Sequence, residues 1–133
     1  TNNYPEHKVL LEATLTESTS QRKNEMEPVS RHLMREIQEN DNDDTYAVFV
    51  ANILQEEVLS DFRSRKNYQF RGKTSVKSGL KIISLSIRDI IKLINIKIQY
   101  SKLYKIFDEA YKDTNINDLE WYEKLVKNKI NNL

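Results

Sequence analysis

The chain of 133 residues has no cysteine, only two glycines, two prolines and two histidines, and no long apolar run. Without cysteine, disulfides and cysteine-ligated zinc sites are excluded, and two histidines are too few for a histidine-rich metal site. No apolar run is long enough to cross a bilayer, so we expect no membrane partner. Because 38% of the residues are hydrophobic and 31% are charged, the composition is that of a soluble globular domain. The cytoplasm is therefore the expected location.

The length suits one domain over residues 1–133 with a modest core. The formal net charge is only +1, but the charges are segregated along the chain. Residues 36–61 carry eight acidic side chains and no basic one, whereas residues 62–88 carry eight basic side chains and no acidic one. Such a basic block can contact phosphate, although a solvated surface is the simpler interpretation of composition alone.

Apolar residues recur at strand and helix spacing in alternating segments. The predicted strands are residues 8–15, 45–51 and 80–87, of which the first should be buried and central and the second buried on both faces. The predicted helices are residues 28–40, with Pro28 at the first position, residues 55–70, and three more that begin near residues 86, 101 and 117. The predicted loops are residues 16–27 and 71–79. This order indicates an α/β fold with parallel strand–helix–strand units and a helical C-terminal tail.

Polar residues gather where the first predicted strand ends, and ligands collect beyond the carboxyl ends of parallel strands. Glu12 and Thr14 lie at this end. The loop that follows offers acids for a cation and bases for an anion, among them Gln21, Arg22, Lys23 and Glu25. Arg31 and His32 fall on the next helix, within reach of a phosphate. Because Mg²⁺ prefers one or two carboxylates together with waters and phosphate oxygens, Glu12 and Glu25 form a candidate magnesium site.

The stretch VLLEATLTESTSQRKNEMEPVSRHL, residues 9–33, resembles the nuclease signature of the AlwI-type type IIS restriction and nicking endonucleases. Those enzymes belong to the PD-(D/E)XK superfamily. The segments YAVFVANILQEEVLSDFR and KIISLSIRDIIKLI resemble the downstream part of the same domain, so the resemblance extends over residues 9–94. It implies a restriction-endonuclease-like mixed sheet, double-stranded DNA as substrate, and Mg²⁺-assisted hydrolysis of phosphodiester bonds.

The resemblance also implies roles for individual residues. Glu12 binds Mg²⁺, and Glu25 is a second ligand or orients the attacking water. Thr14 and Gln21 are accessory residues by this resemblance. From their residue types alone, Arg22, Lys23 and Arg31 are either phosphate contacts or solvated charges, and His32 is either an accessory residue or a packing histidine beside Leu33. Thr14 stands where many members of the superfamily carry a lysine, whose role then falls to Lys23 or to a water held by Glu25.

One superfamily residue has no counterpart in the sequence. The superfamily needs an acid on a strand before that of Glu12, and Glu6 is too close to Glu12 to supply it. We therefore expect the C-terminal part of a nuclease domain, with little activity by itself. Its first strand and acid then come from an upstream segment or a second subunit. The alternative is a non-catalytic DNA-binding or subunit-assembly domain of the same fold.

Overall fold

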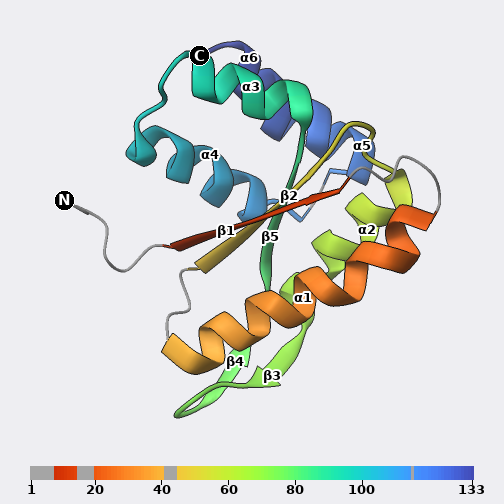
Figure 1. The fold of residues 1–133 in the computed structure, drawn as a ribbon, viewed down its shortest axis with the longest axis vertical. Coiled ribbons are helices and arrows are strands. Elements are labelled where there is room, and N and C mark those ends of the chain that lie inside the picture. The colour runs from red at the N-terminus through yellow and green to blue at the C-terminus, as the bar shows by residue number, and fades with distance from the viewer. Residues whose placement is uncertain (1–7, 15–19, 41–44, 115) are drawn as a thin grey trace.

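The computed structural model describes residues 8–14, 20–40, 45–114 and 116–133, and its main sheet has three parallel strands (Figure 1). The strands β1 (Lys8–Thr14), β2 (Thr45–Ala51) and β5 (Lys81–Ser86) pair in the order β1–β2–β5. A separate antiparallel hairpin consists of β3 (Gln69–Arg71) and β4 (Val76–Ser78). The three predicted strands and their parallel pairing are thus confirmed.

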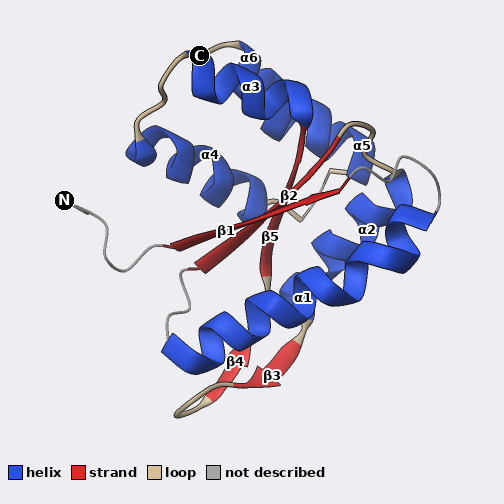
Figure 2. Ribbon diagram, viewed as in Figure 1, coloured by secondary structure: helices blue, strands red, loops and turns tan. Residues whose placement is uncertain are grey.

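Helices connect the parallel strands and follow the last of them (Figure 2). They are α1 (Ser20–Asn40), α2 (Glu56–Ser64), the 3₁₀ helix η1 (Arg65–Asn67), α3 (Ile87–Asn95), α4 (Tyr100–Lys112), α5 (Asp118–Trp121), the π-helical segment η2 (Tyr122–Lys127) and α6 (Asn128–Asn131). The predicted helical tail is confirmed. Among the described residues, no helix is both long and apolar enough to cross a membrane.

Strand β2 is the centre of the molecule, because all seven of its residues are buried. Its alternate side chains enter two different clusters. Ala47 and Phe49 pack with α1 and α2, whereas Tyr46 and Val48 pack with the helices from α3 to α6. Figure 1 shows α1 and α2 on one side of the sheet and α3, α4 and α6 on the other. The central strand is covered on both faces, as its uninterrupted run of apolar residues predicts.

A buried carboxylate joins the end of the sheet to the C-terminal tail. The side chain of Ser86 accepts a hydrogen bond from the backbone N–H of Asp89, and the backbone N–H of Ser86 donates to the Asp89 carboxylate at 2.9 Å. This capping box starts α3, as predicted for residues 86–87. The hydroxyl of Tyr122 donates to the same carboxylate at 2.5 Å. Burial and this hydrogen bond raise the pKa of Tyr122, which keeps the phenol protonated.

Two predicted loops are wrong in part. Residues 20–27 form the first turns of α1, so Pro28 lies inside this helix rather than at its start. The stretch Ser20–Glu27 consists mostly of good helix formers, which offset the hydrogen bond that Pro28 cannot donate. The predicted loop at residues 71–79 contains β4 and the end of β3. Phe70 is the only buried residue of these two strands, so the strands lack the apolar alternation that would have revealed them.

Strand β1 is neither buried nor central within the described residues, contrary to prediction. It pairs with β2 on one side only, and Leu11 is 63% exposed. Leu11, Val48 and Ile83 form one row across the sheet, and the other two are at most 2% exposed. The helices that cover Val48 and Ile83 therefore do not extend over β1. An apolar strand next to an open edge is the arrangement that a further strand or subunit would complete.

From this row we expect two truncations of similar size to lower the free energy of unfolding by unequal amounts. Ile83→Ala should lower the free energy of unfolding by about 2–5 kcal/mol, because it leaves a buried cavity. Leu11→Ala should lower it by less than about 1 kcal/mol, because most of the Leu11 side chain is already in contact with water. Urea denaturation of the chain measures both values. Equal losses would contradict the open edge at β1.

Candidate functional site

The central contact of the candidate site joins β1 to α1. Glu12 shares its face of β1 with Leu10, which packs against the cluster on the α1 side of the sheet. Oε1 of Glu12 lies 2.7 Å from Nδ1 of His32 on α1. The Glu12 side chain is 28% exposed and that of His32 is 41% exposed. The pair thus lies at the surface, with the carboxylate oriented by the imidazole and still accessible to a ligand.

Glu12 is suited to contribute one ligand to a divalent cation. Mg²⁺ prefers carboxylate oxygens as ligands, and a ligating carboxylate is usually oriented by a hydrogen bond from a neighbouring residue. His32 orients Glu12 in this way. The described residues contain no group of three or more metal-ligating side chains. The described side chains therefore fit part of a magnesium site, and other donors must complete it.

Two further predicted residues, Thr14 and Arg31, lie close to Glu12 and His32 in the sequence. Thr14 is the last residue of β1, two positions after Glu12 and opposite Ala51 of β2. Arg31 precedes His32 on α1, and its side chain is exposed. The accessory role of Thr14 and the phosphate contact of Arg31 stay predictions.

The remaining predicted residues, Gln21, Arg22, Lys23 and Glu25, lie in the first two turns of α1 rather than in a loop. Their side chains fall outside the described part of the structure, so their contacts stay predictions. Position 25 lies seven residues before His32 in the same helical row, about 10 Å along the helix axis.

The sequence predicts either packing beside Leu33 or an accessory role for His32, but it does not predict the contact with Glu12. The two residues are twenty positions apart, and only the return of α1 across β1 brings them together. A weak signal was present, because His32 precedes Leu33, a residue on the helix face that packs against the sheet. That signal indicates proximity to the sheet but does not identify a partner.

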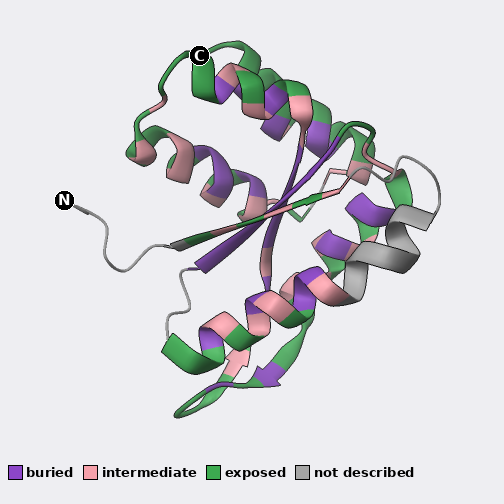
Figure 3. Cartoon of the chain, viewed as in Figure 1, coloured by how far each residue is buried: buried purple, intermediate pink, exposed green. Residues whose placement is uncertain are grey.

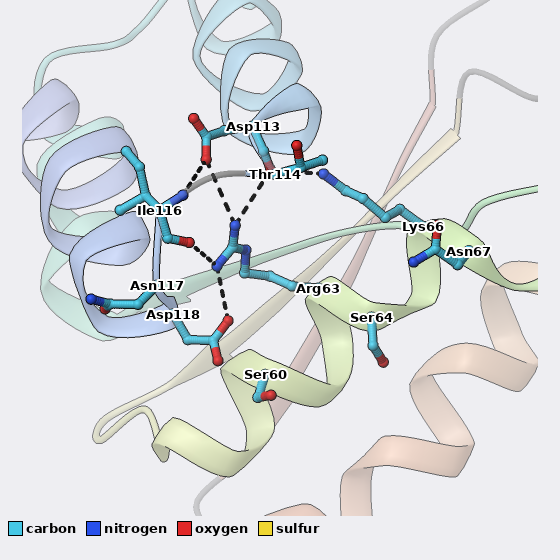
Figure 4. A pocket seen from close by; sticks show the side chains of 10 residues that line it. All are labelled: Ser60, Arg63, Ser64, Lys66, Asn67, Asp113, Thr114, Ile116, Asn117 and Asp118. Atoms are coloured by element: carbon cyan, nitrogen blue, oxygen red, sulfur yellow. Dashed lines mark hydrogen bonds and ion pairs between the residues drawn. The ribbon is translucent and has the colours of Figure 1, made fainter.

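A second cluster of charges surrounds a pocket of about 480 Å³ between α2 and the connection from α4 to α5 (Figure 4). Nη1 of Arg63 donates to the backbone oxygen of Ile116 at 2.7 Å and to Oδ1 of Asp118 at 2.8 Å. Nη2 of Arg63 donates to the backbone oxygen of Asp113 at 3.3 Å. The guanidinium carbon also lies 5.1 Å from the ring centre of Trp121.

Lys66 contributes a second cation to this cluster. Its ammonium donates to the backbone oxygens of Tyr111 and Asp113, where α4 ends. Burial and the nearby charge of Arg63 lower the pKa of Lys66, and the Asp113 carboxylate partly offsets them. Both cations are thus engaged in holding the α4–α5 connection. The pocket shares no lining residue with the Glu12 site, and we interpret it as part of a structural clamp.

A parallel sheet with helices on both faces, and a surface carboxylate oriented by an imidazole on an outer strand, define an α/β domain with a polar site at one side of its sheet. The family model of the AlwI restriction endonuclease matches residues 1–93, which is more than half of the sequence. The chain therefore belongs to the AlwI restriction endonuclease family.

A solved structure has the same fold over nearly the whole chain. It is the small subunit, R.BspD6I2, of the heterodimeric restriction endonuclease R.BspD6I. The two chains superpose with a TM-score of 0.61 at 20% sequence identity, and the match covers 97% of this chain and 70% of the subunit. A search of curated protein sequences finds no significant match.

The Arg63 cluster yields a stability prediction. Arg63→Ala should lower the free energy of unfolding by about 1–3 kcal/mol, because it leaves partly buried carboxylate and carbonyl groups without their donor. Lys124→Ala is the matched control, since its ion pair with Glu120 is exposed on both sides and contributes less than about 1 kcal/mol. Urea denaturation followed by circular dichroism compares the two variants, and similar losses would show that the clamp is dispensable.

Proposed function

We propose that the chain is part of a DNA endonuclease that hydrolyses phosphodiester bonds with the help of Mg²⁺. The observation that carries the proposal is the Glu12 carboxylate, held by His32 on an outer strand of a parallel sheet in a chain of the AlwI family. A bound Mg²⁺ would supply an activated water and shield the charge that develops on the phosphate. Within this chain, Glu12 provides one ligand, and Glu25 is our candidate for a second.

The proposal assigns separate roles to the other residues near Glu12. His32 orients the carboxylate without touching the reacting atoms. Arg22, Lys23 and Arg31 steady DNA phosphates, which positions the duplex but reads no sequence. Thr14 and Gln21 are accessory, and Lys23 or a water held by Glu25 takes the place of the superfamily lysine.

The open edge of β1 supports a partner for this site. Leu11 is exposed and β1 has no neighbour on its outer side within the described residues. We propose that an upstream segment of the same enzyme, or a second subunit, adds a strand here together with the missing acid. The similar small subunit comes from a heterodimeric enzyme, which is consistent with assembly from two chains.

A second function is favoured by a specific observation. The described residues contain no group of three ligating side chains, and Thr14 stands in the position of the expected lysine. A domain that binds DNA or assembles subunits, and that has lost the chemistry, would have these features. Fold alone does not decide between the two functions.

Metal titration distinguishes them directly. We expect calorimetric titration with Mn²⁺ to detect binding to the chain, and Glu12→Gln to abolish it, because the amide removes the anionic ligand without changing the size of the side chain. Nicking of supercoiled plasmid, by the chain joined to its upstream partner segment, should disappear in the same variant while the fold persists. If Glu12→Gln binds and nicks like the unchanged protein, the metal role of Glu12 is wrong.

The role of His32 has its own test. His32→Ala should weaken Mn²⁺ binding by about 10–100-fold, because the carboxylate of Glu12 loses its orienting donor. His32→Gln, whose amide can still donate a hydrogen bond, should recover part of the affinity. A packing role would instead change the unfolding midpoint without changing Mn²⁺ affinity.

A further inference from the structure

One face of α1 carries a row of exposed polar side chains that starts at the candidate site. Arg31, Arg35 and Gln38 are spaced four and three residues apart, so they lie on the same side of the helix. All three are exposed. Arg31 adjoins His32, the partner of Glu12, and the row extends about 10 Å along the helix axis from Arg31 to Gln38.

The β3–β4 hairpin attaches to the end of this row. Nε2 of Gln38 donates to the backbone oxygen of Arg71 at 2.7 Å, which ties the hairpin to the face of α1 that carries the arginines. Figure 1 shows the hairpin beside α1, and Figure 3 shows that most of it is exposed. Phe70 is its only buried side chain and anchors it to the core cluster on the α1 side of the sheet.

The hairpin extends the row with positive charge. Arg71 and Lys73 are exposed, and residues 62–88, which contain the hairpin, have no acidic side chain. The side chains of Arg35, Arg71 and Lys73 form no ion pair within the described part of the chain. Glu39, one turn beyond Arg35, is an acidic neighbour of the row and is likewise not paired with it. Unpaired cations on a protruding ribbon are available for an anionic partner.

We propose that Arg31, Arg35, Arg71 and Lys73, the basic stripe, bind the phosphate backbone of duplex DNA beside the cleavage site. The inference rests on the proposed function and adds a second part to the DNA-binding surface, contributed by the hairpin. The stripe runs along α1 over a distance of about three nucleotide steps of a DNA strand, and its partners are phosphates rather than bases. It holds the duplex along α1 so that one phosphate lies at Glu12.

The competing role for these cations is protection of the hairpin edges from pairing with other strands. The two roles differ in what they predict for DNA affinity and its dependence on salt. Each phosphate contact contributes a slope of about −0.9 to the logarithm of the binding constant against the logarithm of salt concentration. Edge protection contributes no such slope.

The experiment measures binding of the chain to a fluorescent duplex by anisotropy, in EDTA, over a series of NaCl concentrations. The test variant carries Arg35→Gln, Arg71→Gln and Lys73→Gln, and the matched control carries Lys102→Gln, Lys105→Gln and Lys129→Gln on the exposed surfaces of α4 and α6. We expect the salt slope of the test variant to fall by about 3 and its affinity to drop by at least about tenfold. The control should keep both values, and Glu39→Gln should tighten binding.

The outcomes separate this inference from the proposed function. Equal losses of DNA affinity in both triple variants would mean that binding follows net charge. No loss of DNA affinity in the test variant would mean that the cations only protect the hairpin edges. Either result overturns the inference, as would a failure of the unchanged chain to bind duplex DNA at low salt. None of these results touches the Mn²⁺ titration at Glu12, which judges the proposed function independently.

Discussion

The structure depends on the burial of β2, a strand in which all seven residues are buried. A parallel central strand has to be covered on both faces, since its apolar side chains alternate between them. The two helical layers meet this requirement from opposite sides, with α1 and α2 on one face and α3 to α6 on the other. The crossover from β1 to β2 brings α1 back across β1. That return places His32 over Glu12, so the candidate site is a consequence of covering the central strand.

The same constraint explains why the site lies at a boundary. Covering β2 fixes one side of β1, but within the described residues nothing covers its outer edge or the face that carries Leu11. Glu12 is therefore rigid on the side of α1 and accessible on the other. If Glu12 binds a metal ion as we propose, it is positioned by α1, and the remaining ligands would come from another segment or subunit.

Two groups of basic side chains have different physical roles, although both consist of arginine and lysine. Arg63 and Lys66 are partly buried and engaged with carboxylates or carbonyl oxygens, so they hold the α4–α5 connection against α2 and η1. The side chains of Arg35, Arg71 and Lys73 are exposed and form no ion pair with any residue that the structure describes, so their charge is available to a ligand. In the sequence, most of these residues fall within one basic block, residues 62–88. Burial and pairing, which only the folded structure provides, separate the structural cations from those that we assign to DNA.

Much of the architecture could be predicted from the sequence, because it follows from local periodicity. The apolar run of β2, the capping residues Ser86 and Asn117, and the segment around Glu12 that resembles the AlwI family are all local signals. The start of α1 and the hairpin were missed, since strong helix formers ahead of Pro28 and a single buried residue, Phe70, leave ambiguous patterns.

The sequence by itself determined the parallel α/β fold, the edge of the sheet where polar residues gather and the family to which the chain belongs. Only the tertiary structure decided that His32 pairs with Glu12, that β1 has no described neighbour on its outer side and that the hairpin joins the arginine row of α1. The reason is physical. Periodicity and capping act over a few neighbouring residues, whereas these contacts join segments twenty or more positions apart, and their partners are chosen by how the helices pack on the sheet.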